Sequence, residues 1–494
     1  WLKPSAARAA TQELGSMALH EPFGDGVPLG DPSWYQGLRS PFYNKSHASW
    51  RANVRAHVQE ELEPLVEDWD AAAVGGDEVK AKAFFQKAYA ASCANGVVQS
   101  LCGRPWPQAY TSVPAPEGYD VFHELVTIEE LFRVGAGVSW HTEGAAIGLP
   151  PVMTFGVPGD PALQERCASQ VLAGQRVHCL AVTEPTAGSD VANIQTTAVD
   201  DGTGHFVVNG EKKWITNGIY ADYFTVGVRT GGPGAGGLSM LLVERSMPGI
   251  ETRRMLCQGV WPSGTTFVTF SDVRVPKANI IGQLGQGFKQ IMYNFNHERW
   301  ALAAQATRMA RTCLEEAIMY ARSRKTFGKY LVEHEVIQHK LAEMGRACES
   351  LQAWLEFQTF QLNVMPHEEQ NKKLGGHIAL LKVHATKLCE YCAREALQVF
   401  GGAGYTRTGK GQRVERIYRE VRVFAIGGGS EEIMLNLAAS QFGFVKQRAP
   451  DLRDRRIAEL EEELQRLRGI AGSPSRGAST GSAATALAAK ASKL

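Results

Sequence analysis

This sequence lacks an excess of charge of either sign. Its 52 lysines and arginines nearly cancel its 51 aspartates and glutamates, which leaves a formal net charge of +1 over 494 residues. A near-neutral chain has no bulk electrostatic field to attract nucleic acid or an anionic membrane surface. We therefore expect no nucleic-acid partner, and any anionic ligand must be held by local groups.

Long apolar runs and dense cysteines are missing as well. No segment reaches the roughly 18 to 20 apolar residues that a membrane-spanning helix needs, so we expect no transmembrane segment. The nine cysteines are scattered, which favours free thiols in a reducing compartment. Cys389 and Cys392 form a C-x-x-C inside a helical pattern, where packing explains them better than zinc or redox chemistry. His334 and His339 do not share a helix face, and we expect no metal site.

The order of the patterns predicts an α+β protein. Helical spacing dominates the first third, short β-branched and aromatic segments follow, and long helical patterns return after Gly287. This order predicts an N-terminal helical domain, a middle antiparallel β domain and a C-terminal helical bundle. The predicted boundaries are 1–45 (N-terminal arm), 46–176 (N-terminal helical domain), 177–286 (β domain), 287–448 (C-terminal helical domain), 449–470 (amphipathic helix) and 471–494 (flexible tail).

Three segments outside the main patterns have simple interpretations. The irregular first 45 residues are expected to pack on the main body. The glycine-rich stretch Gly231–Gly237 lies between two strand patterns, which predicts a hairpin turn and not a phosphate cradle. The predicted helix 449–470 repeats apolar residues at three-four spacing, which fits a small coiled-coil contact between subunits or a helix lying on its own subunit. Two heptads are too few to choose between these two. The apolar positions are Ile457, Leu460, Leu464 and Leu467.

Four motifs carry the functional signal. Ala181–Asp190 (AVTEPTAGSD) predicts a strand running into a turn that offers hydroxyls and backbone N–H groups, which suit a flavin edge or a phosphate. The others are Trp214–Gly218 (WITNG), Arg324–Gly328 (RKTFG) and Gln398–Tyr405 (QVFGGAGY). In this order, the four motifs resemble those of the acyl-CoA dehydrogenase family over roughly residues 47 to 445. One departure is Asn193, where the family usually has a small residue.

The resemblance implies an acyl-CoA dehydrogenase-like fold, FAD as cofactor and acyl-CoA as substrate. In the family the third and fourth motifs reach the FAD of a neighbouring subunit, which implies a homo-oligomer, either a tetramer or a dimer. Arg324 suits this role because a guanidinium binds phosphate through two parallel hydrogen bonds. By resemblance the FAD contacts are Leu180, Val182, Thr183, Gly188, Ser189, Trp214, Ile215, Thr216, Arg324, Phe327, Gln398, Gly401, Gly402, Ser430 and Glu432.

The reaction of the family needs a carboxylate base opposite the flavin. Many members carry this base in a C-terminal loop, but Gly428 stands at that position here. A minority, including the isovaleryl and long-chain enzymes, supplies it from a helix just before an arginine. Tyr293–Arg299 (YNFNHER) matches that helix. The resemblance therefore implies that Glu298 is the catalytic base.

Further site residues follow from the same comparison. The backbone N–H of Gly428, with a flavin ribityl hydroxyl, is expected to bond the thioester oxygen and stabilise the enolate-like charge. Ser189, Arg299 and Gly429 are expected to lie near the substrate. His297 has two open interpretations: it tunes the neighbouring base, or it is simply a hydrogen-bonded helix residue.

The electron acceptor leaves three hypotheses open. In the first, oxygen takes the electrons and yields hydrogen peroxide, as in an acyl-CoA oxidase. In the second, an electron-transferring flavoprotein takes them. In the third, Gly428 marks a protein that binds FAD and acyl-CoA without turnover. The last residues, Ser492-Lys493-Leu494, match the address read by the peroxisomal import receptor. They predict a peroxisomal location and favour the first hypothesis. The chain begins at Trp1, so an N-terminal address stays open.

Overall fold

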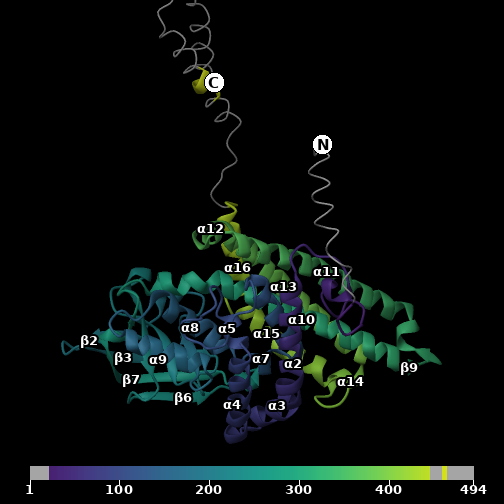
Figure 1. The fold of residues 1–494 in the computed structure, drawn as a ribbon, viewed down its shortest axis with the longest axis horizontal. Coiled ribbons are helices and arrows are strands. Elements are labelled where there is room, and N and C mark those ends of the chain that lie inside the picture. Colours follow the sequence, from purple (N-terminus) through teal and green to yellow (C-terminus); the bar gives the residue numbers. More distant parts are fainter. Residues whose placement is uncertain (1–21, 445–458, 464–494) are drawn as a thin grey trace, which may run out of the picture. The chain divides into compact units, whose positions relative to one another are not determined.

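The computed structural model describes residues 22–444 and 459–463. Helices, a sheet and a second group of helices follow one another along the chain, in the α+β order that the sequence predicts (Figure 1). The helices before the sheet are α2 (Lys45–His57), α3 (Val66–Gly75), α4 (Glu78–Ala94), α5 (Val97–Leu101), α6 (Val121–Leu131), α7 (Ala136–Ser139), α8 (Glu143–Phe155) and α9 (Pro161–Leu172).

The helical spacing that begins at Ser46 does not form one continuous helix. Helix α2 passes into a π-helical turn, Val58–Leu62, and a 3-10 turn, Glu63–Leu65, before α3 begins. Pro64 explains the break because it has no N–H to donate and its ring crowds the preceding turn. The break lets α3 begin as a separate helix.

The middle of the chain forms an eight-stranded sheet in the order β6-β7-β3-β2-β4-β5-β8, with β1 paired to β4. Most pairs are antiparallel as predicted, but β1 and β2 each run parallel to β4. Neither strand is joined to β4 by a hairpin, because β3 lies between them in the chain, so a parallel pairing is available. The strands are β1 (His178–Ala181), β2 (Thr197–Asp200), β3 (His205–Ile215), β4 (Tyr223–Arg229), β5 (Leu238–Glu244), β6 (Ile250–Arg254), β7 (Thr266–Pro276) and β8 (Ile280–Ile281).

The predicted hairpin at Gly231–Gly237 is confirmed. Strands β4 and β5 pair antiparallel on either side of it, with Arg229 opposite Leu238. A second joint involves Asn217 of the WITNG motif, which is fully buried. Its side chain accepts from the Gly144 N–H (2.8 Å) and donates to the carbonyls of Trp140 (3.0 Å) and Ser263 (2.8 Å). The motif therefore fastens the sheet to the start of α8.

Long helices follow the sheet. Helix α10 is 37 residues long and has no proline, and no glycine after its first residue, so nothing in it interrupts the backbone ladder. Trp300 at its centre is fully buried and donates to Thr359 Oγ1 of α11 at 2.9 Å. The remaining elements are α10 (Gly287–Ser323), β9 (Lys325–Thr326), β10 (Lys329–Tyr330), α11 (Glu335–Val364), α12 (His367–Lys373), α13 (Gly375–Phe400), α14 (Gly402–Tyr405), α15 (Gln412–Ile426) and α16 (Glu431–Gln441).

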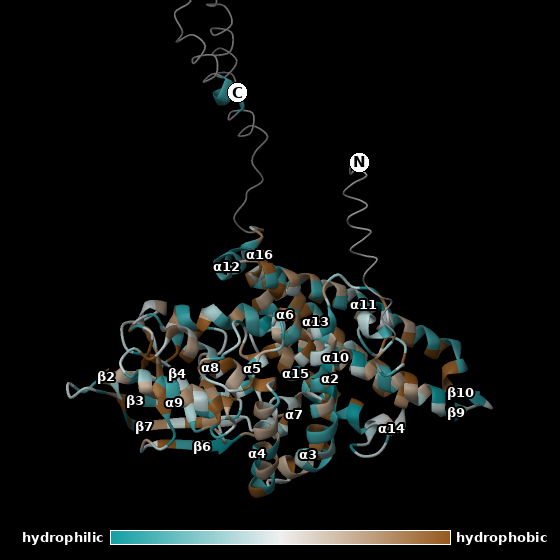
Figure 2. Cartoon of the chain, viewed as in Figure 1, coloured by the Kyte–Doolittle hydropathy of each residue, from teal (hydrophilic) through white to brown (hydrophobic). Residues whose placement is uncertain are grey.

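The long helices carry apolar and polar residues together, as the mixed colours of Figure 2 show. Cys389 and Cys392 lie buried among the apolar residues of α13 as free thiols. No helix within the described ranges is apolar enough, over a sufficient length, to cross a bilayer. Of the predicted helix 449–470, residues 459–463 are helical and the others lie outside the described residues, as does the predicted tail 471–494.

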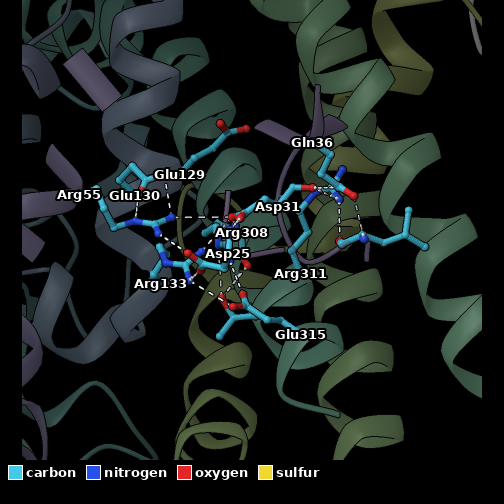
Figure 3. A network of polar contacts seen from close by, with 12 residues as sticks. Asp25, Asp31, Gln36, Arg55, Glu129, Glu130, Arg133, Arg308, Arg311 and Glu315 are labelled. Atoms are coloured by element: carbon cyan, nitrogen blue, oxygen red, sulfur yellow. Dashed lines mark hydrogen bonds and ion pairs between the residues drawn. The ribbon is translucent and has the colours of Figure 1, made fainter. Parts of the chain in front are cut away.

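Residues 22–44 of the predicted arm meet the helices through buried charges (Figure 3). Asp31 Oδ1 lies 3.0 Å from Arg133 Nη1 and 3.1 Å from Arg308 Nη1, and the Asp31 side chain is 3% exposed. Glu315 of α10 joins the same two arginines at 3.2 and 2.9 Å. This network therefore ties the arm to α10.

Candidate active site

Glu298 lies on α10 with its side chain half-buried. Asn294, one turn earlier, donates its side-chain amide to Glu298 Oε1 at 3.1 Å. Within the described part of the chain, no cationic nitrogen approaches this carboxylate within 4.0 Å. Burial raises the pKa of Glu298 to about 7, against the opposing effects of the Asn294 hydrogen bond and the charges of His297 and Arg299. A carboxyl group with this pKa can take up a proton near neutral pH.

His297 points to a different partner. Its Nε2 lies 2.7 Å from Glu124 Oε1 of α6, a carboxylate with a 2% exposed side chain. Burial opposes the charged imidazole, but the Glu124 charge and hydrogen bond outweigh burial and raise the pKa of His297. His297 is therefore a hydrogen-bonded helix residue, which is one of the two interpretations of the sequence. Its charge also acts to lower the pKa of Glu298.

The loop between α15 and α16 disfavours a side chain at Gly428. Gly428 has a φ of 66° and Gly429 a φ of 106°, in the region that favours glycine. A Cβ on Gly428 would come within 2.6 Å of Leu302 Cδ1. Arg299 Nε donates to the Gly428 carbonyl at 3.0 Å. The segment of α10 that carries Glu298, the predicted base, therefore lies against the loop at Gly428.

A second acid close enough to feel the charge of Glu298 was missed by sequence reasoning. Glu143 begins α8, and its Oε2 accepts from Gln305 Nε2 at 3.4 Å, while Gln305 Oε1 accepts from Trp140 Nε1 at 3.1 Å. Burial and then the charge of Glu298 raise the pKa of Glu143 to about 7. Gln305 lies seven residues after Glu298 on one face of α10. In the sequence Glu143 looks like an ordinary acid in the first turn of a helix.

The first two motifs lie side by side, because the Lys213 N–H donates to the Thr183 carbonyl at 2.9 Å. Trp214 is 49% exposed at a φ of 60°, and the hydroxyls of Thr183, Ser189 and Thr216 have no hydrogen-bond partner among the described residues. Free hydroxyls beside an exposed aromatic ring fit the polar edge and the ring of a flavin. Val182 and Ile215 are buried, Leu180 is half-buried, and Gly188 is exposed.

Glu184, inside the first motif, has a structural partner. Its Oε1 lies 2.8 Å from Lys212 Nζ and accepts from the Thr196 N–H at 2.9 Å. Both charged side chains are buried, so each neutralises the other. Glu184 therefore holds the turn that presents the hydroxyls.

The third and fourth motifs meet each other, away from the first two. Tyr320, near the end of α10, stacks on Phe400 at the end of α13 with ring centroids 4.2 Å apart. Strand β9 and helix α14 lie toward one end of Figure 1, and strands β2 and β3 lie at the other. Phe327 is 98% exposed. The other predicted residues at this end are exposed as well: Arg324, Gln398, Gly401 and Gly402.

Two predicted FAD contacts follow the glycine loop. The Ser430 hydroxyl accepts from the Ile433 N–H at 3.4 Å, at the start of α16, and Glu432 is exposed.

His47, Asp120 and His123 form a compact cluster that resembles a metal-ligand set. Nδ1 of His47 accepts from the Asn44 N–H at 3.0 Å, and Nδ1 of His123 accepts from the Asp120 N–H at 3.2 Å. His47 Nε2 then faces Asp120 Oδ1 at 2.9 Å as the donor. The cluster thus caps the starts of α2 and α6.

Comparisons with known proteins agree with this geometry. The chain matches the family models "Acyl-CoA dehydrogenase, middle domain" over residues 179–273 and "Acyl-CoA dehydrogenase, C-terminal domain" over residues 285–442. It is 38% identical to acyl-CoA dehydrogenase apdG of Emericella nidulans, over 84% of this chain and 95% of that protein. Among solved structures, a probable acyl-CoA dehydrogenase from Mycobacterium abscessus superposes with a TM-score of 0.71 at 34% identity, covering 81% of this chain and all of that one. The chain belongs to the acyl-CoA dehydrogenase family and is an FAD-dependent oxidoreductase that acts on acyl-CoA.

Proposed function

We propose that Glu298 is the catalytic base in the conversion of a fatty acyl-CoA to a trans-2-enoyl-CoA. The observation that carries this proposal is a pair of positions. The loop has a glycine, Gly428, at a φ of 66°, and Glu298 lies on the neighbouring helix α10 with a pKa raised to about 7. Glu298 takes the proton from the carbon next to the thioester carbonyl. That C–H electron pair becomes the new double bond as a hydride leaves the following carbon. Bound FAD supplies the hydride acceptor.

The chain stabilises the charge that develops on the thioester oxygen. The backbone N–H groups of Gly428 and Gly429 have no acceptor among the described residues, so both are free to donate to this oxygen. Arg299 holds the Gly428 carbonyl and adds a positive charge beside the pocket. Ser189, exposed beside the flavin site, is available to the substrate.

Anaerobic mixing with a saturated acyl-CoA tests the base. FAD-loaded wild-type protein bleaches, and Glu298→Gln loses bleaching by about 100-fold or more while FAD stays bound. Glu369→Gln, on the partly exposed α12, is the matched control and bleaches normally. Bleaching that survives in Glu298→Gln would assign the base to another residue. No bleaching in the wild type would favour the alternative of a non-catalytic FAD and acyl-CoA binder.

We further propose oxygen as the electron acceptor, which makes the protein an acyl-CoA oxidase that yields hydrogen peroxide. The support is the Ser492-Lys493-Leu494 address, because peroxisomes usually lack the flavoprotein acceptor. Air admitted to the bleached enzyme should restore the flavin colour within seconds and release one peroxide per flavin. Slow recovery would favour the second candidate, a dehydrogenase that passes electrons to an electron-transferring flavoprotein. The relatives above carry dehydrogenase names, which supports testing this alternative directly.

The same address supports a peroxisomal location and binding to the peroxisomal import receptor. A fluorescent protein fused ahead of the chain should label peroxisomes, and removal of Leu494 should leave the label in the cytosol. Unchanged peroxisomal labelling after this removal would contradict the role of the tripeptide.

We also propose a homo-oligomer, either a dimer or a tetramer, whose FAD sites are shared between subunits. The support is the separation of the two groups of motifs, together with the exposed Phe327. Arg324→Ala should lower FAD affinity without changing the fold. A monomer that binds FAD as tightly as the oligomer would contradict shared sites.

A further inference from the structure

Lys382 of α13 is a buried amine that no motif in the sequence points to. Lys382 is fully buried, and its Nζ donates to the Gly429 carbonyl at 2.8 Å. Among the residues that the structure describes, no carboxylate lies within 4.0 Å of this nitrogen. A buried ammonium without an ion pair costs several kcal/mol in desolvation. An apolar side chain would fill the same space without this cost.

The partner of Lys382 is the loop that the reaction uses. Three consecutive glycines lose more backbone freedom on ordering than other residues, so their conformation needs external anchors. The Gly427 N–H donates to the Val423 carbonyl at 2.7 Å, Arg299 holds the Gly428 carbonyl at 3.0 Å, and Lys382 holds the Gly429 carbonyl. Each anchor comes from a different helix.

Anchored carbonyls determine where the N–H groups point. A trans peptide is planar, with its N–H opposite its C=O, so the hold on the Gly428 carbonyl directs the Gly429 N–H to the other side of the loop. The hold on the Gly429 carbonyl likewise orients the next peptide, which keeps this arrangement from rotating. The free N–H of Gly429 is thereby kept on the side away from Arg299, and the hold on the Gly429 carbonyl restricts rotation of the loop beside it.

We propose that Lys382 is a positioning residue for the reaction, which holds the Gly429 carbonyl so that the glycine-loop N–H groups stay directed at the thioester oxygen. This inference rests on the proposed function, because it assigns the glycine loop to the thioester. The ammonium also contributes a positive charge that favours the enolate-like form of the substrate over its neutral form. Its effect should therefore fall on turnover more than on substrate binding.

The test compares Lys382→Met with wild-type holoenzyme. We expect kcat to fall by about 10- to 100-fold and KM to change by less than about threefold, because a misplaced oxyanion donor acts in the transition state. The melting temperature should stay equal or rise, since the buried charge is gone. Lys387→Met on the same helix, with a 59% exposed side chain, is the matched control and should behave as wild type.

A second probe separates this inference from the proposed function. A 3-oxoacyl-CoA ionises to its enolate in the oxyanion site without hydride transfer, and ultraviolet absorbance of the enolate reports the stabilisation directly. Lys382→Met should bind the enolate form about 10-fold or more weakly. If wild-type protein ionises this probe but never bleaches with a saturated acyl-CoA, the proposed function fails and the positioning role of Lys382 stands. If wild-type protein bleaches and Lys382→Met matches it in kcat and enolate binding, only this inference is overturned.

The pH profile gives a readout in the unmodified enzyme. Burial lowers the pKa of Lys382 to about 8, with Arg299 acting in the same direction and Glu431 and Glu432 opposing. The wild-type kcat should therefore decline above about pH 8 as the ammonium loses its charge, and Lys382→Met should lack this decline. A fall in kcat of Lys382→Met that is accounted for by lost FAD or a lowered melting temperature would show a merely structural role and overturn the proposal.

Discussion

Two carboxylates of this molecule, Asp31 in the arm network and Glu298 on α10, have opposite proton affinities. In the arm network, burial alone would raise the pKa of Asp31, but Arg308 and Arg133 outweigh it and lower that pKa to about 2. Glu298 and Glu143 have no cation within ion-pair distance in the described residues, and burial raises the pKa of each to about 7. For Asp31 and Glu298, the difference in pKa therefore comes from the counter-charges beside Asp31.

The two regions share one helix. Arg308 and Glu315 of the network lie on α10, downstream of Glu298 on the same rigid element. Ion pairs with Arg133 and Arg308 hold the arm to α10, while Glu298, which has no ion pair among the described residues, can exchange a proton. A rigid support beneath a reactive group preserves its geometry.

The largest effect is expected from breaking the network. Asp31→Ala leaves Glu315 as the remaining carboxylate shared by Arg133 and Arg308. Removal of one partner from a buried ion pair costs about 3 to 5 kcal/mol. Urea unfolding at neutral pH measures this loss in the free energy of unfolding. Asp25→Ala is the matched comparison in the same arm and should cost less, because that side chain is 30% exposed. A loss for Asp31→Ala below about 1 kcal/mol would show that the network is dispensable.

The sequence predicts the fold well, because the helical and strand patterns are local. The AVTEPTAGSD and WITNG segments each determine a short turn whose shape depends on near neighbours. Asp31 and Arg308, by contrast, are 277 positions apart, and no local pattern indicates such a pair. Glu143 and Lys382 were missed for the same reason. Each looks like an ordinary helix residue in the sequence, and only the fold places Glu143 near Glu298 and Lys382 against Gly429.

The pH dependence of turnover should follow the unpaired acid. Glu298 acts as a base only when ionised, so kcat/KM should fall about tenfold for each pH unit below about 7. Stopped-flow bleaching of the flavin across about pH 5 to 9 measures this limb. An acidic limb near the ordinary glutamate pKa of 4.5 would show that burial does not control the base.

Replacing the second acid should move this limb. The repulsion between Glu143 and Glu298 is mutual, so the neutral amide of Glu143→Gln should lower the apparent pKa of the base by about half a unit to one unit. Gln305→Ala, which removes the hydrogen bond to Glu143 and keeps the charge, is the comparison variant and should leave the limb close to neutral pH. An unmoved limb in Glu143→Gln would mean that the two carboxyl groups titrate independently.

The same variant should change stability with pH. The folded-state pKa of Glu143 is raised from 4.5 to about 7, so the folded protein prefers the neutral acid and loses stability as pH rises between these values. Glutamine cannot ionise and avoids that loss. The melting temperature of Glu143→Gln should therefore exceed that of the wild type at pH 8 and match it at about pH 4.5. A lower melting temperature at pH 8 would contradict the charge conflict in the pocket.

The smallest effect is expected at the surface. Glu369 and Lys373 on α12 form a pair 2.6 Å apart whose side chains are 40% and 63% exposed. Water and salt screen such a pair, so Glu369→Gln should change the free energy of unfolding by about 0.5 kcal/mol or less. Raising the ionic strength to about 1 M should remove even this difference, whereas the loss caused by Asp31→Ala should persist because its partners are shielded from solvent ions. Equal salt sensitivity of the two variants would mean that the arm network is open to water and that its ion pairs are screened like the surface pair.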